Sequence, residues 1–460
     1  MSQDDAVRPG LDAPVSPLDA AARLAGKRGR IVLHSARNDD GLGGCSFATA
    51  EPQATLIGRG HSLVELDRRG RPVRRFTDDP LAAAERFLAQ HGCILEPRHG
   101  DTEPRVIGYF GYDLARTIEP LPGGSTIGDD APDLWLAAYG AAARWSPGDP
   151  ARAEIVGPDP DARARLADAL TRRAPPSLAP SIHGFVPDDD ASHHIARIER
   201  IRDYLASGDV YQVNLARRLV ARIAAPGDAL ALYTAFAEIA PAPYGALIEA
   251  DGATLISGSP ERFLASVGDR IETRPIKGTR ARGDGAAAAL AGSSKDAAEH
   301  LMIVDLMRND LGRIAETGSV AVDELGYIVE LPGLVHKVSR VSARPRPGTG
   351  YADLLRATFP GGSITGAPKV RAMQLIAELE PVRRGPYCGA FGYFGARGAF
   401  DLAVAIRIGL VSHSELRVHV GGGIVADSDA AAELVETELK AAGWVAAVDR
   451  LQAIRGAGPA

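Results

Sequence analysis

The strongest constraint on the fold of this chain is a pair of predicted apolar strands, each broken by glycine or proline. One runs from Ala253 to Ile256 and the other from Arg270 to Pro275. Glu261 follows the first break, and Lys277 lies at the second. Because strand ends on a rigid scaffold commonly present reactive side chains, we predict that these two lie close together. On spacing alone, an ordinary hairpin with a weak surface Glu–Lys pair explains the same pattern.

Hydrophobic periodicity predicts an α+β fold, because strands come in groups between helices instead of alternating with them. Ile195, Ile198, Ile201 and Leu205 share one face of a predicted helix. Further helices are predicted at 296–315, 368–379 and 430–448. The predicted strands include 30–34, 211–219, 246–256, 388–396, 400–410 and 416–420.

Composition excludes several classes of protein. The chain has 460 residues, enough for two domains or one large elaborated domain, and its formal charge of -6 argues against nucleic acid as a partner. Cys45, Cys93 and Cys388 are widely spaced and form no CxxC zinc motif, which is typical of a reducing compartment. No apolar run approaches a membrane span. We therefore expect a cytoplasmic protein without a membrane or nucleic-acid partner.

Four motifs carry a resemblance to a known family. They are Ser257–Leu264, Arg274–Arg280, Asp209–Leu215 and Gly385–Tyr393. Together they are similar to the chorismate-utilising enzymes, and the likeness extends over about residues 188–444. The resemblance implies two large stacked, mainly antiparallel β-sheets flanked by outer helices, with the substrate site between the sheets and nearby loops.

The resemblance also organises the chain into regions. We predict a loose tail at 1–28 that becomes a short helix near 18–24, and a region like the N-terminal part of anthranilate synthase component I at 29–171. A proline-rich linker at 172–190, a chorismate-binding catalytic region at 191–452 and a C-terminal tail at 453–460 follow.

Lys277 separates branches of the family, because most branches carry a small residue in the motif that here contains this lysine. A lysine resembles the aminodeoxychorismate synthase branch, which implies conversion of chorismate and ammonia to 4-amino-4-deoxychorismate for folate synthesis. In that scheme Lys277 attacks the ring and Glu261 protonates the leaving hydroxyl. A lysine is nucleophilic only when burial or nearby cations lower its pKa.

Other site residues follow from the resemblance. Glu299 and Glu436 match the family's magnesium-binding carboxylates, although by themselves they are ordinary helix charges. Strand alternation points Arg407 away from its isoleucine neighbours, so that its guanidinium would grip a carboxylate. The residues that match substrate-side positions are Thr279, His336, Ser363, Tyr393, Arg407, Gly421, Gly422, Gly423 and Lys440. Taken without the resemblance, the glycine triplet predicts a tight turn.

Ammonia must come from another protein, because none of the three cysteines lies in the glycine-flanked elbow of an amidotransferase nucleophile. We expect a separate glutamine amidotransferase subunit. Two alternatives remain: an anthranilate synthase component I, which eliminates pyruvate, and a catalytically silent homologue that binds a ligand. Some family members bind tryptophan in a pocket that Ser46 and Phe47 resemble in part, and whether tryptophan binds here stays open.

Overall fold

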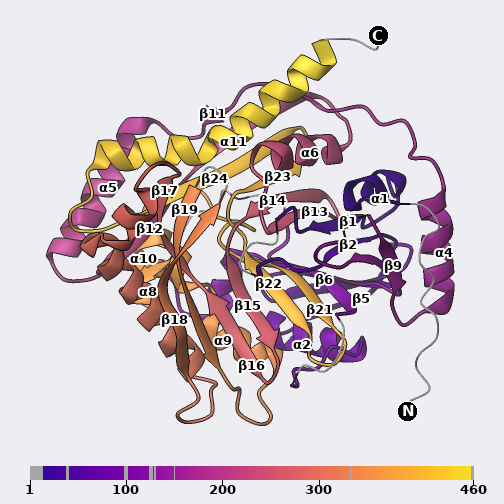
Figure 1. Ribbon diagram of the computed structural model, residues 1–460, viewed down its shortest axis with the longest axis horizontal. Helices are drawn as coiled ribbons and strands as arrows, with labels where there is room; N and C mark the ends of the chain where they lie inside the picture. Colours follow the sequence, from indigo (N-terminus) through magenta and orange to yellow (C-terminus); the bar gives the residue numbers. More distant parts are fainter. Residues whose placement is uncertain are drawn as a thin grey trace.

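The computed structural model describes residues 14–37, 41–97, 102–123, 128, 131–149, 151–331 and 334–456. Figure 1 shows strands gathered at the centre of the molecule with helices around them. None of the helices in this described part is both long and apolar enough to cross a membrane.

The helices are α1 (Pro17–Arg23), α2 (Pro80–Gln90), η2 (Tyr112–Leu114), α3 (Ala115–Ile118), α4 (Pro160–Thr171), α5 (Ala191–Ala206), α6 (Ala229–Ile239), α7 (Ala286–Ala291), α8 (Ser294–Gly312), α9 (Tyr351–Thr358), η3 (Gly362–Ile364), α10 (Lys369–Leu379) and α11 (Ala430–Gly456). The strands are β1 (Ile31–His34), β2 (Ser46–Thr49), β3 (Ala54–Arg59), β4 (Ser62–Asp67), β5 (Pro72–Thr77), β6 (Pro104–Phe110), β7 (Leu134–Ala138), β8 (Ala142–Trp145), β9 (Ala153–Val156), β10 (Ser181–Ile182), β11 (Val186–Pro187), β12 (Gln212–Ala225), β13 (Tyr244–Ala250), β14 (Ala253–Ser259), β15 (Arg262–Val267), β16 (Arg270–Arg274), β17 (Ile276–Ala281), β18 (Ala321–Leu331), β19 (Leu334–Ala343), β20 (Gly366–Ala367), β21 (Ala390–Gly395), β22 (Phe400–Val404), β23 (Ile408–Ser412) and β24 (Glu415–Ile424).

These strands form two 12-stranded sheets, so the predicted α+β class is confirmed. The first sheet has the order β10-β12-β24-β23-β14-β13-β1-β2-β8-β9, and β11 and β20 also pair with β12. The second has the order β17-β19-β16-β15-β22-β21-β6-β7-β3-β4-β5, and β18 pairs with β19. Neighbouring strands such as β12 and β24, or β21 and β6, pair antiparallel.

Strands from the two halves of the chain share both sheets. β1 pairs with β13 in the first sheet, and β6 pairs with β21 in the second. The segment 172–190, predicted as a linker, contributes β10 and β11 to the edge formed by β12. Each sheet is therefore completed only when residues from both predicted regions have come together, and this non-local pairing positions the site described below.

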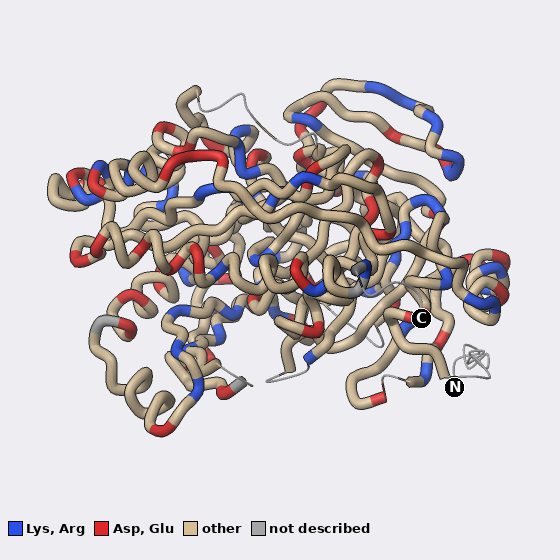
Figure 2. The backbone as a smooth tube through the Cα atoms, turned by 90° about the horizontal axis from the view of Figure 1, so that it is seen from above, with Lys and Arg blue, Asp and Glu red and all other residues tan. Residues whose placement is uncertain are grey.

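Helices cover the sheets through large apolar side chains. Trp444 of α11 stacks on Phe236 of α6 with ring centroids 3.9 Å apart. Gly409 of β23 makes room for that indole, because a Cβ at this position would lie 2.7 Å from the Trp444 ring. Figure 2 shows acidic and basic residues interspersed along the chain, which agrees with the absence of a broad basic field in the sequence.

The described residues 14–28 of the predicted N-terminal tail pack against the fold, and α1 agrees with the short helix predicted near 18–24. Pro17, Ala20 and Ala21 of α1 are buried, and Trp145 donates a 2.7 Å hydrogen bond from its indole nitrogen to the carbonyl of Val15. An apolar helix face outweighs the turn-forming composition of this segment. Residues 1–13 and 457–460, which belong to the predicted tails, lie outside the described residues.

Two long predicted strands are each split in the structure. The run 246–256 turns back on itself as the hairpin of β13 and β14. The run 400–410 is interrupted between β22 and β23, where Arg407 has a φ of 51°. The strand alternation invoked for Arg407 is therefore wrong, because a left-handed backbone conformation redirects its side chain.

A buried ion pair ties α10 to the first sheet. Arg384, only 2% exposed, donates to both carboxylate oxygens of Glu380, at 2.9 and 2.7 Å. The same guanidinium donates to the carbonyls of Ile364 and Asn214, and Glu380 accepts from the backbone N–H of Ala216. The pair therefore holds η3 against β12.

We expect Arg384→Met to lower the free energy of unfolding by about 3–5 kcal/mol, because it leaves the Glu380 carboxylate buried without its partner. Urea denaturation followed by circular dichroism measures the change. Arg172→Met is the matched control, since Arg172 is 71% exposed in its pair with Asp168 and its loss should cost at most about 1 kcal/mol. Equal effects of the two substitutions would contradict this account.

Candidate functional site

Glu261 is a buried carboxylic acid at the junction of β14 and β15. Its carbonyl accepts a 3.0 Å bond from the backbone N–H of Val404, which fixes the turn. Its side chain, in a residue only 5% exposed, accepts a 2.5 Å bond from the hydroxyl of Ser363 and another from the backbone N–H of Ile276. Burial raises the pKa of Glu261 to about 7, against the opposing effects of Ser363 and of the nearby Lys277 amine. This carboxyl suits proton donation near neutral pH.

Lys277 lies on β17, at an irregularity where the register with β19 shifts between Ile276 and Thr279. Gly278, with a φ of 83°, permits the bulge, so the predicted strand end is a bulge within a strand. Burial is the largest influence on Lys277 and, with help from Lys440, lowers the pKa of its amine. The carboxylates of α8, α11 and Glu261 oppose this shift. The structure thus brings the acid and the amine into one site between the two sheets.

The glycine triplet lies opposite this amine. Gly421, Gly422 and Gly423 belong to β24 and pair with β12, so the tight turn suggested by the residues alone is wrong. A Cβ on Gly423 would lie 3.1 Å from the Lys277 Nζ. Because the glycines of β24 have no side chains, the Lys277 amine on the second sheet can approach the first sheet.

Helix α11 presents charged side chains to the same strand. Lys440 donates a 2.7 Å bond to the carbonyl of Gly421 and forms a 2.6 Å ion pair with Glu436. A Cβ on Gly422 would lie 3.0 Å from a carboxylate oxygen of Glu433 and 3.7 Å from one of Glu436. The charged face of α11 thus lines the glycine strand.

The residues around Lys277 suit a hard divalent cation. Glu299 of α8 and Glu436 of α11 both act electrostatically on the Lys277 amine, so two carboxylates from separate helices face one region. Within the described ranges, no group of three or more histidine, cysteine, aspartate or glutamate side chains could hold a metal by itself. Magnesium characteristically uses one or two protein carboxylates, with water and substrate oxygens as further ligands. This donor set fits such an ion.

His336 and Thr279 pair across β17 and β19. The Oγ1 of Thr279 is 2.8 Å from Nδ1 of His336, while Nε2 of this buried histidine has no hydrogen-bond partner among the described residues. Burial, assisted by Arg407 and Arg37, lowers the pKa of His336 to about 4. The imidazole is therefore neutral at physiological pH, with one nitrogen available to a ligand.

Arg407 supplies a positive charge beside this histidine. Burial lowers the pKa of its guanidinium, and no carboxylate of the described chain opposes that shift. Its backbone carbonyl is held by the N–H of Gly258 at 3.1 Å. A partly buried guanidinium without a carboxylate partner in the described structure is suited to bind a ligand carboxylate in a bidentate manner.

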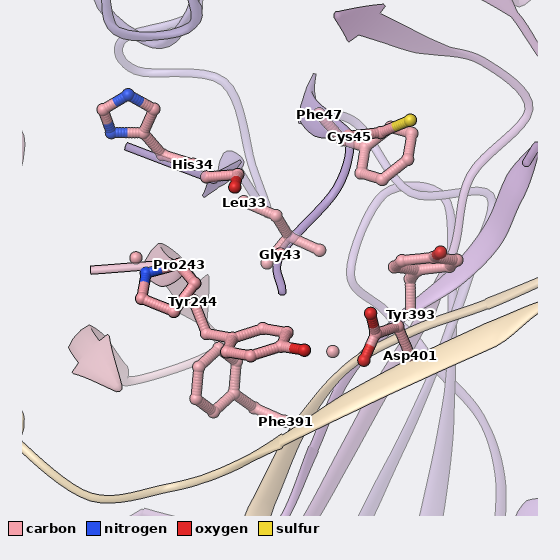
Figure 3. Close-up of a pocket in the computed structure, with 13 residues that line it drawn as sticks. Leu33, His34, Gly43, Cys45, Phe47, Pro243, Tyr244, Phe391, Tyr393 and Asp401 are labelled. Carbon is pink, nitrogen blue, oxygen red and sulfur yellow. The ribbon is translucent and has the colours of Figure 1, made fainter. Parts of the chain in front are cut away.

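Tyr393 lies away from this cluster. β21 pairs it with Asp401 of β22, and its ring packs edge-on against Phe47 at 5.1 Å. Strand register therefore places it in a separate pocket, where Figure 3 shows Tyr393 and Phe47 together with Tyr244. The predicted role of Tyr393 at the chorismate site stays a prediction.

The separate pocket is lined mainly by apolar groups. Of the two residues that resemble part of a tryptophan pocket, Phe47 is among the lining residues and Ser46 is not. The hydroxyl of Ser46 instead accepts a 3.0 Å bond from the backbone N–H of Ser35. Asp401, also in the lining, pairs with Arg262, the residue directly after Glu261.

Two side-chain amides beside Lys277 were not predicted as site residues from the sequence. Gln212 and Asn214 of β12 both lie within 3 Å of the position of a Cβ on Gly423, beside Lys277. Their i, i+2 spacing places both on one face of a strand whose other residues are largely buried. Two polar residues on one face of a buried strand are the signal that would have identified them.

Comparisons with known proteins agree with this arrangement. Residues 45–445 match the model of a family described as chorismate binding enzyme. The chain is 40% identical to aminodeoxychorismate synthase component 1 of Klebsiella aerogenes, over 88% of this chain and 91% of the relative. It is 35% identical to anthranilate synthase component 1 of Streptomyces coelicolor, over 96% and 88%.

Solved structures show the same fold. Anthranilate synthase component I from Streptococcus pneumoniae superposes with a TM-score of 0.76 at 30% identity, covering 87% of this chain and 92% of that chain. The isochorismate synthase MenF of Escherichia coli superposes with a TM-score of 0.69 at 22% identity, covering 94% and 91%, and supports the fold alone. Family model, identity and architecture thus agree, and the chain belongs to the chorismate binding enzyme family.

Proposed function

We propose that this enzyme converts chorismate and ammonia to 4-amino-4-deoxychorismate. The observation that carries the proposal is the lysine amine of lowered pKa beside the buried acid of raised pKa, Lys277 and Glu261. An amine must be neutral to attack carbon, and an acid must be protonated to assist a leaving hydroxyl. The match to relatives named aminodeoxychorismate synthase component 1 adds support.

The chemical steps follow from these two groups. Lys277 attacks ring carbon 2, both conjugated double bonds of the ring shift, and the carbon 4 hydroxyl takes the Glu261 proton and leaves as water. Ammonia then adds at carbon 4, both double bonds shift back, and the lysine is expelled. The enolpyruvyl ether stays intact throughout.

We also propose that Mg²⁺ binds at Glu299 and Glu436 together with a substrate carboxylate. When bound, the ion would neutralise negative charge on the substrate. Glu436→Gln should raise the magnesium concentration needed for half-maximal turnover, because one anionic ligand is lost. Titrating Mg²⁺ into EDTA-treated protein measures this, both by turnover and by calorimetry. An unchanged magnesium dependence in the variant would contradict the assignment.

A separate glutamine amidotransferase is proposed to supply the ammonia. Burial raises the pKa of both Cys93 and Cys388 to about 12, which keeps these thiols protonated and unreactive. Ammonium salts should therefore support turnover by the isolated chain, while glutamine should do so only after such a subunit is added.

Arg407→Lys should raise the KM for chorismate by about tenfold, with a smaller change in kcat, because an ammonium group cannot grip a carboxylate with a planar pair of donors. Steady-state kinetics with saturating ammonium provide the measurement. Arg71→Lys, at an arginine 68% exposed, is the control and should leave both constants unchanged. A normal KM in Arg407→Lys would remove this residue from the carboxylate site.

Product identification tests the proposed function directly. The purified chain is incubated with chorismate, Mg²⁺ and an ammonium salt, followed by liquid chromatography with mass spectrometry and an assay for pyruvate. An aminated product that keeps its enolpyruvyl group, without pyruvate, is expected. Anthranilate with pyruvate would overturn the proposal in favour of the reaction named for the Streptomyces coelicolor relative.

A further inference from the structure

Asn214 lies next to the amine of the site. The ladder between β12 and β24 places it opposite Gly423. Its Oδ1 is 2.8 Å from the position that a Cβ on Gly423 would occupy, and the Nζ of Lys277 is 3.1 Å from the same position. The missing side chain of the glycine therefore leaves the amide and the amine as neighbours over one bare Cα.

The other end of the same carboxamide reaches the acid. Asn214 Nδ2 donates a 2.7 Å bond to the carbonyl of Ser363, and its backbone N–H donates to the carbonyl of Thr365 at 2.8 Å. The hydroxyl of Ser363 in turn donates to Glu261 at 2.5 Å. The Asn214 side chain thus links the turn around Ser363, which holds Glu261, to the strand β24, which faces the Lys277 amine.

The orientation of this carboxamide is determined by its partners. Nδ2 must face the Ser363 carbonyl, which accepts only, and Oδ1 must accept the 3.0 Å bond from Gln212 Nε2. This bond leaves a second lone pair on Oδ1, and Oδ1 and the Lys277 Nζ lie 2.8 and 3.1 Å from the same Cβ position on Gly423. Because the amide is uncharged, it can orient the amine without adding negative charge that would favour protonation of the lysine.

We propose that Asn214 is a positioning residue that holds Lys277 and the Ser363–Glu261 pair in one hydrogen-bonded frame. The inference rests on the proposed function for the roles of acid and nucleophile. Asn214 does not itself exchange a proton or form a bond with the substrate.

The inference has a consequence for the pH dependence. Ser363 lowers the pKa of Glu261, as do the backbone N–H of Ile276 and the amine of Lys277, and Cys388 is the other titratable group that interacts with this acid. Without the bond from Asn214 Nδ2, Ser363 should no longer be held in position to donate its hydroxyl bond to Glu261. The pKa of Glu261 should then rise above about 7. Since the acid works when protonated, the decline of activity at high pH should move to higher pH.

The test compares Asn214→Leu, Ser363→Ala and the double variant through pH profiles of chorismate consumption. Both single variants should shift the high-pH decline upward, and the double variant should shift it no further than Ser363→Ala. The kcat of Asn214→Leu should also be about tenfold lower than the kcat of Ser363→Ala, because the Lys277 amine loses its orientation only in Asn214→Leu. In Asn214→Leu the KM for chorismate should stay within about twofold, since Asn214 is not among the groups proposed to contact the substrate.

Asn309→Leu, at an exposed position of α8, is the matched control and should change neither the profile nor kcat. Thermal unfolding checks that each variant is folded. If Asn214→Leu does not fold, Asn214→Ala replaces it, because alanine removes the carboxamide without adding bulk or charge. An unmoved decline in the folded Asn214 variant, or additive shifts in the double variant, would overturn the inference.

The proposed function is judged separately by the product of the wild-type enzyme. Formation of anthranilate and pyruvate would refute the proposed reaction, whereas the Asn214 comparison would still be decided by chorismate consumption. The two failures are therefore distinguishable.

Discussion

Lys277→Ala is expected to lower kcat on the order of 10³-fold, because it removes the proposed nucleophile from a site that holds it next to the ring. Steady-state turnover with ammonium measures the loss. Intact-mass spectrometry of acid-quenched wild-type enzyme should show a chorismate-derived adduct that is absent from the variant. The effect should appear mainly in kcat, since the groups proposed to bind carboxylate and magnesium remain.

Lys27→Ala is the control for this experiment. Lys27 pairs with Glu51 and is 33% exposed, and its removal should leave turnover and adduct unchanged. Wild-type turnover in Lys277→Ala, with no adduct in the quenched wild-type enzyme, would rule out the covalent route.

Glu261→Gln is expected to lower kcat by about 10²–10⁴-fold, the usual contribution of a positioned general acid. The amide can accept the hydrogen bond from Ser363 but has no proton to give to the departing hydroxyl. The pKa of Glu261 is raised to about 7, so in the wild-type enzyme the protonated form is lost as the pH rises through that value. Activity should therefore fall above about pH 7, and the variant should lack this decline.

A pH profile of kcat from the acidic to the alkaline range makes the comparison. Glu238→Gln, which alters an exposed ion pair with Arg450, should keep the wild-type profile. A Glu261→Gln enzyme with the same decline would show that another group titrates there.

The positions of Glu261 and Lys277 at breaks in predicted strands could be read from local sequence, whereas their chemical roles were predicted only from the family resemblance. Glu261 follows a strand that ends in proline, and Lys277 adjoins a glycine of positive φ, so both positions carried recognisable signals. Helix α10 begins and ends within a residue of its predicted limits, whereas α11 extends eight residues beyond its predicted end at 448. These features depend on neighbours within a few positions along the chain.

Other features could not be predicted in this way. Arg407 adopts a left-handed backbone conformation inside an apolar run that otherwise alternates like a strand. Tyr393 resembles a substrate residue in sequence, yet the register between β21 and β22 places it in the pocket with Phe47. The tail around α1 is held by Trp145, more than a hundred residues away in the chain.

The α+β class, the kinds of functional group available and the family resemblance could all be recognised in the amino-acid sequence, because each depends on short motifs or on local periodicity. Only the tertiary structure decided which groups meet. Asn214, Lys277 and Gly423 come from three strands far apart in the sequence. The pairing of β12 with β24 places Asn214 opposite Gly423, and Lys277 approaches them from the second sheet. Burial at this site removes water from Glu261 and Lys277, and this desolvation moves their pKa values in opposite directions.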